Sequence, residues 1–207
     1  MRETIVEART KNIDGISDWF WIKDETGAWT GPAIDWASSH KEKFLQHVRK
    51  RDVVICAGGN QGMYPRLFAR EFHYVFAFEP DPLNFYVMNL NCQEDHIIKI
   101  QAALGAKADS IALWRNSMIN TGMHRVSGRG MIPQMALDNF FFPTVDLIQL
   151  DVEGYESDVL RGAEQTIVTH RPVITCENAD KEIMSFLSRL GYVAIDQSVS
   201  DTIFIPA

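Results

Sequence analysis

Glycine and polar residues that could bind a ligand follow several short apolar stretches of the chain. Glycines allow a ligand close to the backbone, and free backbone N–H groups can meet an anionic group. If the apolar stretches are parallel strands, their carboxyl ends meet at one edge of a sheet and form one site. The residues at these five ends are Gly58, Gly59, Asn60 and Gly62; Glu79, Pro80 and Asp81; Gln101 and Ala102; Asp151, Glu153 and Gly154; and Glu177 and Asn178.

The glycine cluster departs from the familiar phosphate-binding patterns. A Walker loop needs GxxxxGK[ST], which is absent here, and a dinucleotide fingerprint needs a glycine where this chain has Asn60. Glu79, however, lies 21 positions after Gly58, close to the spacing of about 20 at which an acid accepts two ribose hydroxyls. The pattern favours a ligand with an adenosine-like ribose, and the methionine part of S-adenosylmethionine suits such a loop. An ordinary strand-to-helix turn remains the alternative for the glycines alone.

The elements that position these residues alternate between strand and helix. Such alternation predicts βαβ units and a mainly parallel sheet with helices on both faces. The last two strands follow each other without a helix, which predicts seven strands with one antiparallel strand near an edge. Expected strands cover 52–57, 74–80, 97–104, 145–154, 171–178, 192–198 and 201–207, with an extra strand or hairpin arm at 110–116; expected helices cover 35–50, 63–72, 81–92, 155–167 and 180–191.

From residue 50 to 206 the chain resembles the FkbM family of S-adenosylmethionine-dependent methyltransferases. The specific blocks are FEPDP and LDVEGYE…LRGA, accompanied by VVICAGGNQG, IQAALG, ALD and RPVITCEN. The resemblance implies a class I methyltransferase Rossmann-like fold and, typically, methylation of hydroxyl oxygens of sugars and natural products. It also implies which part of the cofactor each site residue contacts. Gly58, Asn60 and Gly62 would line the methionine moiety, Glu79 would bind the ribose, and Pro80 and Asp81 would shape the adenosine edge. Gln101 and Ala102 would lie beside the adenine, and Asp151 would lie next to the reactive end of the cofactor.

Two positions depart from the family pattern. Cys56 stands where such loops usually carry Asp, and Gly59 stands where they usually carry Ala. A neutral thiol cannot bind the ammonium of the cofactor, so either the affinity is lower or Asp151 takes over that role. We expect Cys56 to be a small buried hydrophobic residue and not a reactive thiol.

Catalysis of O-methylation needs a group that takes the hydroxyl proton. The candidate bases are Asp151, Glu153 and His124; a solvated loop is the alternative for His124. We predict no metal, although Asp151, Glu153, Glu177 and Asp180 could converge on Mg²⁺. Two other functions stay open: a protein of this fold that binds S-adenosylmethionine without turnover, and an NAD-dependent oxidoreductase.

Residues 1–45 form a different kind of segment from the domain expected at 46–207. They contain Trp19, Trp21, Trp29 and Trp36, four of the five tryptophans, and are predicted to cover or cap the site, or else to pack as an aromatic cover.

The net charge of −7 argues against nucleic acid as a partner, and the chain has neither a membrane-spanning run nor a signal-peptide core. Three cysteines without CxxC spacing suggest reduced thiols in the cytoplasm. The expected partner is a small-molecule or glycan acceptor, with no membrane; oligomeric state is not predicted.

Overall fold

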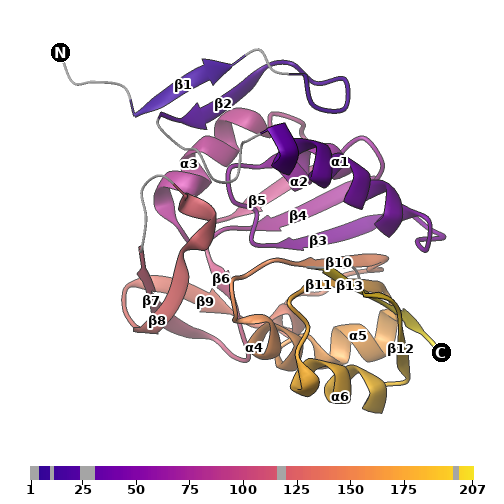
Figure 1. Ribbon diagram of the computed structural model, residues 1–207. Helices are drawn as coiled ribbons and strands as arrows, with labels where there is room; N and C mark the ends of the chain where they lie inside the picture. Colours follow the sequence, from indigo (N-terminus) through magenta and orange to yellow (C-terminus); the bar gives the residue numbers. More distant parts are fainter. Residues whose placement is uncertain (1–4, 10–11, 24–30, 116–119, 198–200) are drawn as a thin grey trace.

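The computed structural model describes residues 5–9, 12–23, 31–115, 120–197 and 201–207. Its centre is a seven-stranded sheet (Figure 1). The strands are β3 (Val53–Ala57), β4 (Tyr74–Phe78), β5 (Ile97–Ile100), β10 (Leu147–Leu150), β11 (Val173–Glu177), β12 (Tyr192–Gln197) and β13 (Asp201–Pro206).

The strand order is β12-β13-β11-β10-β3-β4-β5. The five strands from β11 to β5 are parallel, and β13 runs antiparallel to both of its neighbours. The predicted α/β fold with one antiparallel strand near an edge is therefore confirmed. It follows from the connection between β12 and β13, which is too short for the crossover that a parallel neighbour needs.

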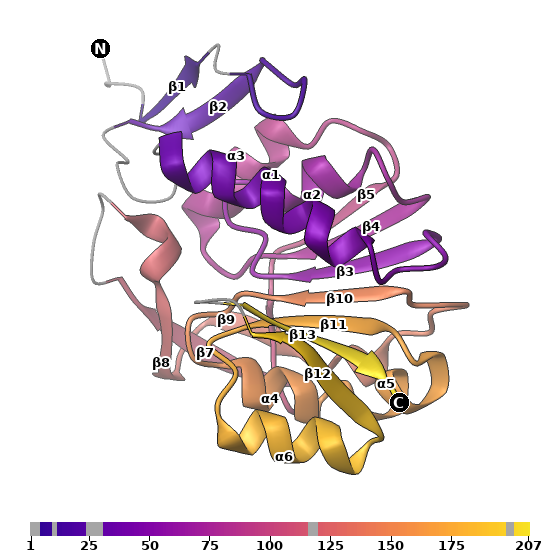
Figure 2. The same ribbon diagram turned by 45° about the vertical axis from the view of Figure 1, so that its right-hand side comes forward.

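Helices cover both faces of the sheet, as predicted (Figures 1 and 2). Neighbouring strand residues point to opposite faces, so each central strand contributes to both cores. Val54 and Cys56 of β3 pack in the core beneath the first three helices, whereas Ile55 packs in the core on the other side. The first layer contains α1 (Gly31–Leu45), α2 (Met63–Phe68) and α3 (Pro82–Asn91); the second contains α4 (Glu156–Arg161), α5 (Glu164–His170) and α6 (Lys181–Arg189).

The predicted helices differ in their bounds, and the helix expected over 63–72 ends at Phe68. The helix expected over 35–50 begins at Gly31 and ends at Leu45. The helix expected over 155–167 is divided in two, because the carbonyl oxygen of Gly162 accepts from Asp138 N–H, at 2.8 Å, and the Asp138 carboxylate accepts from the backbone N–H groups of Gln165 and Thr166. Asp138 therefore caps the start of α5 from a distant part of the chain, which no local pattern indicates.

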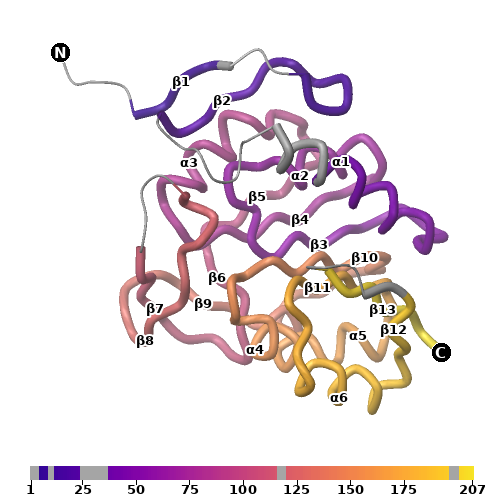
Figure 3. Tube along the Cα trace, in the orientation of Figure 1, coloured from indigo at the N-terminus to yellow at the C-terminus, as the bar shows by residue number. Residues whose placement is uncertain are grey.

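The strand expected over 97–104 is also divided, with consequences for the site. β5 ends at Ile100, and the next two residues lead into β6 (Ala103–Leu104), which belongs to a separate sheet of order β6-β9-β7-β8. Figure 3 follows the chain as it leaves β5 and turns towards β6. The other strands of this small sheet are β7 (Asp109–Trp114), which the sequence predicted as an extra strand or hairpin arm, and β8 (Arg125–Arg129) and β9 (Ile132–Met135), which it did not.

The N-terminal segment forms a hairpin that lies on the first helix layer (Figure 1). Its strands β1 (Val6–Arg9) and β2 (Trp19–Ile22) are antiparallel. Trp19 and Trp21 are fully buried and pack with Ile13 and with Leu67 of α2. Trp29 lies outside the described residues. No helix among the described residues is long and apolar enough to cross a membrane.

Candidate active site

A cavity of about 240 Å³ lies at the carboxyl ends of the parallel strands. Loops after β3, β4, β10 and β11 form one side of it, and residues 120–124, which lead into β8, form the other together with Val126 of β8 and parts of β6 and β7. Its lining includes the predicted residues Gly58, Asn60, Glu79, Pro80, His124, Asp151 and Glu153, together with Glu177. Asn84, Thr121, Met123 and Tyr155 also line it, and the sequence did not point to them.

The glycine loop approaches the end of β10 very closely. Gly58 has φ +87°, and a Cβ atom there would lie 1.8 Å from the carbonyl oxygen of Asp151, so only glycine fits. Gly59 and Gly62 instead allow the loop to pack closely against α3 and its C-cap. An added Cβ atom at Gly59 would lie 2.7 Å from the sulfur atom of Met88, and one at Gly62 would lie 2.7 Å from that of Cys92. These two glycines therefore pack on the helix, while Gly58 and Asn60 line the cavity.

Glu79 is anchored where β4 ends. Its two carboxylate oxygens accept from Asn60 N–H at 2.7 Å and from Asp81 N–H at 2.8 Å. Burial raises the pKa of Glu79 to about 7, although these two hydrogen bonds act in the opposite direction. Each oxygen keeps a second lone pair, so the carboxylate can accept further hydrogen bonds from a ligand in the cavity.

Asp81 anchors the wall of the cavity that lies opposite the glycine loop and contains His124. Its Oδ1 atom caps α3 by accepting from the N–H groups of Leu83 and Asn84. Its Oδ2 atom binds Arg115 Nε at 2.7 Å and His124 Nδ1 at 3.1 Å. The buried carboxylate thus ties the segment that carries His124 to the central fold.

Gln101 and Ala102 do not line the cavity. Gln101 is exposed and Ala102 is buried, and the next residues, Ala103 and Leu104, face the cavity instead. The reason is the turn that follows β5, in which Ala102 N–H donates to the carbonyl oxygen of Ile100. This turn shifts the chain out of the strand register on which the sequence prediction relied.

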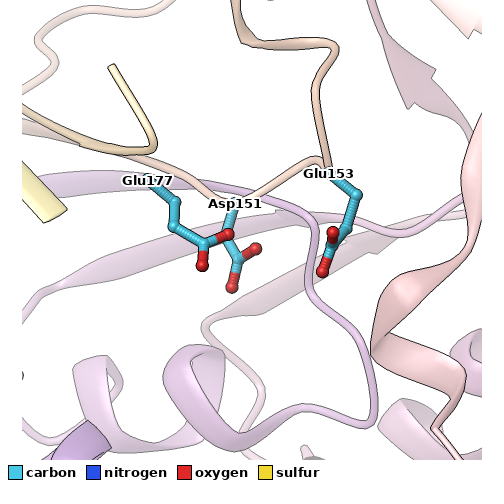
Figure 4. A group of neighbouring side chains, drawn as sticks. All are labelled: Asp151, Glu153 and Glu177. Carbon is cyan, nitrogen blue, oxygen red and sulfur yellow. The ribbon is translucent and has the colours of Figure 1, made fainter. Parts of the chain in front are cut away.

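Three carboxylates gather in the cavity (Figure 4). Asp151, Glu153 and Glu177 each place an oxygen within 4.8 Å of the others. Burial first, and then the neighbouring charge of Glu177, raises the pKa of Asp151 and raises that of Glu153 to about 7. Such oxygens can hold a cationic group or a hard metal ion. Asp180, the fourth acid considered from the sequence, caps α6 and is not part of this group.

Two buried amide oxygens in the cavity lining have no hydrogen-bond partner among the described residues: Asn60 Oδ1 and Asn84 Oδ1. An unpaired buried acceptor is costly, and a ligand that donates a hydrogen bond would relieve that cost. Cys56, in contrast, is fully buried in the core beneath α1–α3, and burial raises the pKa of its thiol far above the ordinary value. It is a neutral core residue, as expected.

The raised pKa of Glu79 predicts a stability that falls as pH rises. The folded protein keeps the Glu79 proton up to about pH 7 while the unfolded chain loses it near 4.5, so stability is lost over that interval. The contribution is about 3 kcal/mol at most. Urea unfolding from pH 5 to pH 8 should show the decline for the wild type and a smaller one for Glu79→Gln. Equal slopes for the two proteins would contradict the expectation.

The strand order and the antiparallel β13 define a class I methyltransferase fold. Among solved structures the chain is similar to a methyltransferase FkbM from Methylobacillus flagellatus KT, with TM-score 0.51 and 14% identity over 81% of this chain and 50% of that chain. It thus spans half of that protein. Another similar structure is the magnesium protoporphyrin IX methyltransferase (ChlM) of Synechocystis PCC 6803 with bound SAM, with TM-score 0.50 and 9% identity over 84% of this chain and 79% of that chain.

Residues 57–194, well over half of the chain, match the model of the methyltransferase FkbM domain. The chain therefore belongs to the FkbM methyltransferase family, and the resemblance seen in its sequence motifs is confirmed. It is also 23% identical over 184 residues to the hexuronic acid methyltransferase AglP of Haloferax volcanii, covering 73% of this chain and 76% of the relative.

Proposed function

We propose that this protein transfers a methyl group from S-adenosylmethionine to a hydroxyl oxygen of a sugar or another small hydroxylated metabolite. The observation that carries the proposal is that one and the same cavity joins Gly58, Glu79 and the carboxylates of Asp151, Glu153 and Glu177. Membership of the FkbM family supports methyl transfer.

The cavity suits this cofactor chemically. Glu79 can accept both ribose hydroxyls, and the unpaired oxygens of Asn60 and Asn84 can accept from amino or hydroxyl groups. The three acidic side chains complement a ligand with an ammonium and a sulfonium, whereas the pyrophosphate of NAD would be repelled by them. When bound, S-adenosylmethionine supplies an electrophilic methyl group attached to a positively charged sulfur atom.

The acceptor is proposed to enter between the acidic group and residues 120–126. A sugar is favoured because the relative from Haloferax volcanii is a methyltransferase of hexuronic acid. The protein must hold the acceptor hydroxyl in line with the methyl group, and positioning of this kind can supply most of the rate acceleration.

Glu153 is the base that we favour among Asp151, Glu153 and His124. Its pKa of about 7 makes the carboxylate a better proton acceptor than an ordinary one, and it is still ionised in part at neutral pH. The rate of methyl transfer should rise with pH through about 7. Glu153→Gln should lower the rate about 10²–10⁴-fold and remove this pH dependence. A pH–rate profile that is unchanged in the variant would exclude Glu153 as the base.

The function is tested first by calorimetric titration of the protein with S-adenosylmethionine, S-adenosylhomocysteine and NAD in parallel. Binding of the first two ligands and not of NAD supports the proposal and is followed by an acceptor screen over acidic and neutral sugars. Binding of NAD alone would contradict it. Cofactor binding with no methyl transfer to any acceptor would favour a binding protein without turnover.

A further inference from the structure

Gln61 connects two parts of the protein that lie far apart in the sequence. Its side chain is fully buried within the glycine loop, next to Asn60. Its Oε1 atom accepts from Ile22 N–H of the N-terminal hairpin at 3.0 Å, and its Nε2 atom donates to Thr121 Oγ1 in the cavity wall at 3.3 Å. One side chain therefore touches the hairpin and the wall, while its own backbone belongs to the glycine loop.

The hairpin is joined to the same loop by a second buried amide, Asn91 of α3. Asn91 accepts from Phe20 N–H at 2.7 Å and donates to the carbonyl oxygen of Phe20 at 2.9 Å, which fixes β2 to α3. Its amide nitrogen also donates to the carbonyl oxygen of Gln61 at 2.6 Å. The hairpin, Asn91 and Gln61 thus form one buried hydrogen-bonded unit.

Thr121 is the point at which this unit meets the cavity. It is buried, lines the cavity, and its carbonyl oxygen also accepts from Asn84 Nδ2 at 3.1 Å. Hydrogen bonds made by buried side-chain amides have a defined geometry, and the loss of one partner leaves the other without a hydrogen bond, which costs free energy. The position of the wall therefore depends on the glycine loop and, through Gln61, on the hairpin.

We propose that Gln61 is a positioning residue that couples the N-terminal hairpin to the wall of the ligand cavity. The hairpin then helps to position the cavity wall, although Trp19 and Trp21 pack away from the cavity in their own cluster. The identity of the ligand in this inference rests on the proposed function, whereas the coupling itself rests on the hydrogen bonds.

A double-mutant cycle between Gln61 and Thr121 tests the coupling. Gln61→Met and Thr121→Val keep a similar side-chain size, and each removes the Gln61–Thr121 hydrogen bond; Gln61→Met also removes the bond from Ile22 N–H. Calorimetry with S-adenosylhomocysteine should show a loss of affinity of about ten-fold for Gln61→Met, and no further loss in the double variant. Fully additive losses would overturn the inference.

Asn91→Ala tests the part played by the anchoring of the hairpin, because it removes both bonds to Phe20 and the bond to the Gln61 carbonyl oxygen without changing the Gln61 side chain. It should weaken binding of S-adenosylhomocysteine and speed amide hydrogen exchange over residues 120–126. The matched control is Asp180→Ala, which removes the cap of α6, on the opposite face of the sheet. Asn91→Ala with affinity and exchange like those of Asp180→Ala would refute a role for the hairpin.

Hydrogen exchange without ligand separates this inference from the proposed function. Faster exchange over residues 120–126 in Gln61→Met supports the coupling whatever the ligand is. If the wild-type protein binds neither S-adenosylmethionine nor S-adenosylhomocysteine, the proposed function is contradicted. Hydrogen exchange in the wild type and in Gln61→Met would still decide whether the coupling exists. Unchanged exchange in Gln61→Met would overturn the coupling and leave the function intact.

Discussion

Glu79→Ala should lower the affinity for S-adenosylmethionine by about 10²–10⁴-fold while the protein stays folded. The carboxylate is expected to accept two ribose hydroxyls, and a hydrogen bond to a charged group contributes about 1.5–3 kcal/mol. Its two backbone donors, Asn60 N–H and Asp81 N–H, hold the carboxylate in place before the ligand arrives. Calorimetric titration with S-adenosylmethionine measures the loss, and circular dichroism monitors the fold.

Glu182→Ala is the control for Glu79→Ala, since Glu182 is an exposed acid on α6. It should leave cofactor affinity unchanged. Glu79→Gln provides a second variant that keeps the shape of the side chain but replaces one of the two acceptor oxygens by an NH₂ donor. Wild-type affinity in either Glu79 variant would remove Glu79 from the ribose site.

Asp151→Asn should lower the rate of methyl transfer by about 10²–10³-fold, because Asp151 approaches Gly58 through its carbonyl oxygen and contributes one of the three grouped carboxylates that complement the sulfonium. The substitution removes one charge from a group in which burial and Glu177 already raise the pKa of Asp151. Stability near pH 8 should therefore hold or rise. Single-turnover methyl transfer and urea unfolding, measured on the same preparation, separate the two effects.

Asp158→Asn is the matched control for Asp151→Asn. Asp158 lies on α4, shortly after the same loop, and forms a surface ion pair with Arg161 that contributes little to stability. Its rate and stability should stay close to wild type. If Asp151→Asn also transferred methyl groups at the wild-type rate, Asp151 would have no part in the mechanism.

The two variants address different ends of the cavity. Glu79 ends β4 and acts on binding, whereas Asp151 follows β10 and acts on the reacting groups. A loss of affinity confined to the first, together with a loss of rate confined to the second, would orient the cofactor in the cavity. A reversed pattern would mean that the cofactor lies the other way round.

Local sequence determined the central sheet and the residues at its carboxyl edge. Strand and helix patterns depend on residues two to four positions apart, so β3, β4, β10 and β11 were recognisable, and parallel strands bring their ends together. The position of Glu79 beside the glycine loop followed from this rule and from its spacing. The family motifs lie in the same stretches, and for this reason the family was recognisable too.

Tertiary structure decided the other side of the cavity. β6, β8 and β9 are short strands of a separate sheet in which β6 pairs with β9, about 30 residues further on, and the segment before β8 brings Thr121 and His124 opposite the glycine loop. The structure also decided which of the four acids converge: Glu177 approaches Asp151 through the register of β10 and β11, whereas Asp180 does not. The Gln61 bonds join residues 39 and 60 positions away. Contacts at such separations depend on how elements pack and which loops close, and neither leaves a local periodicity in the sequence.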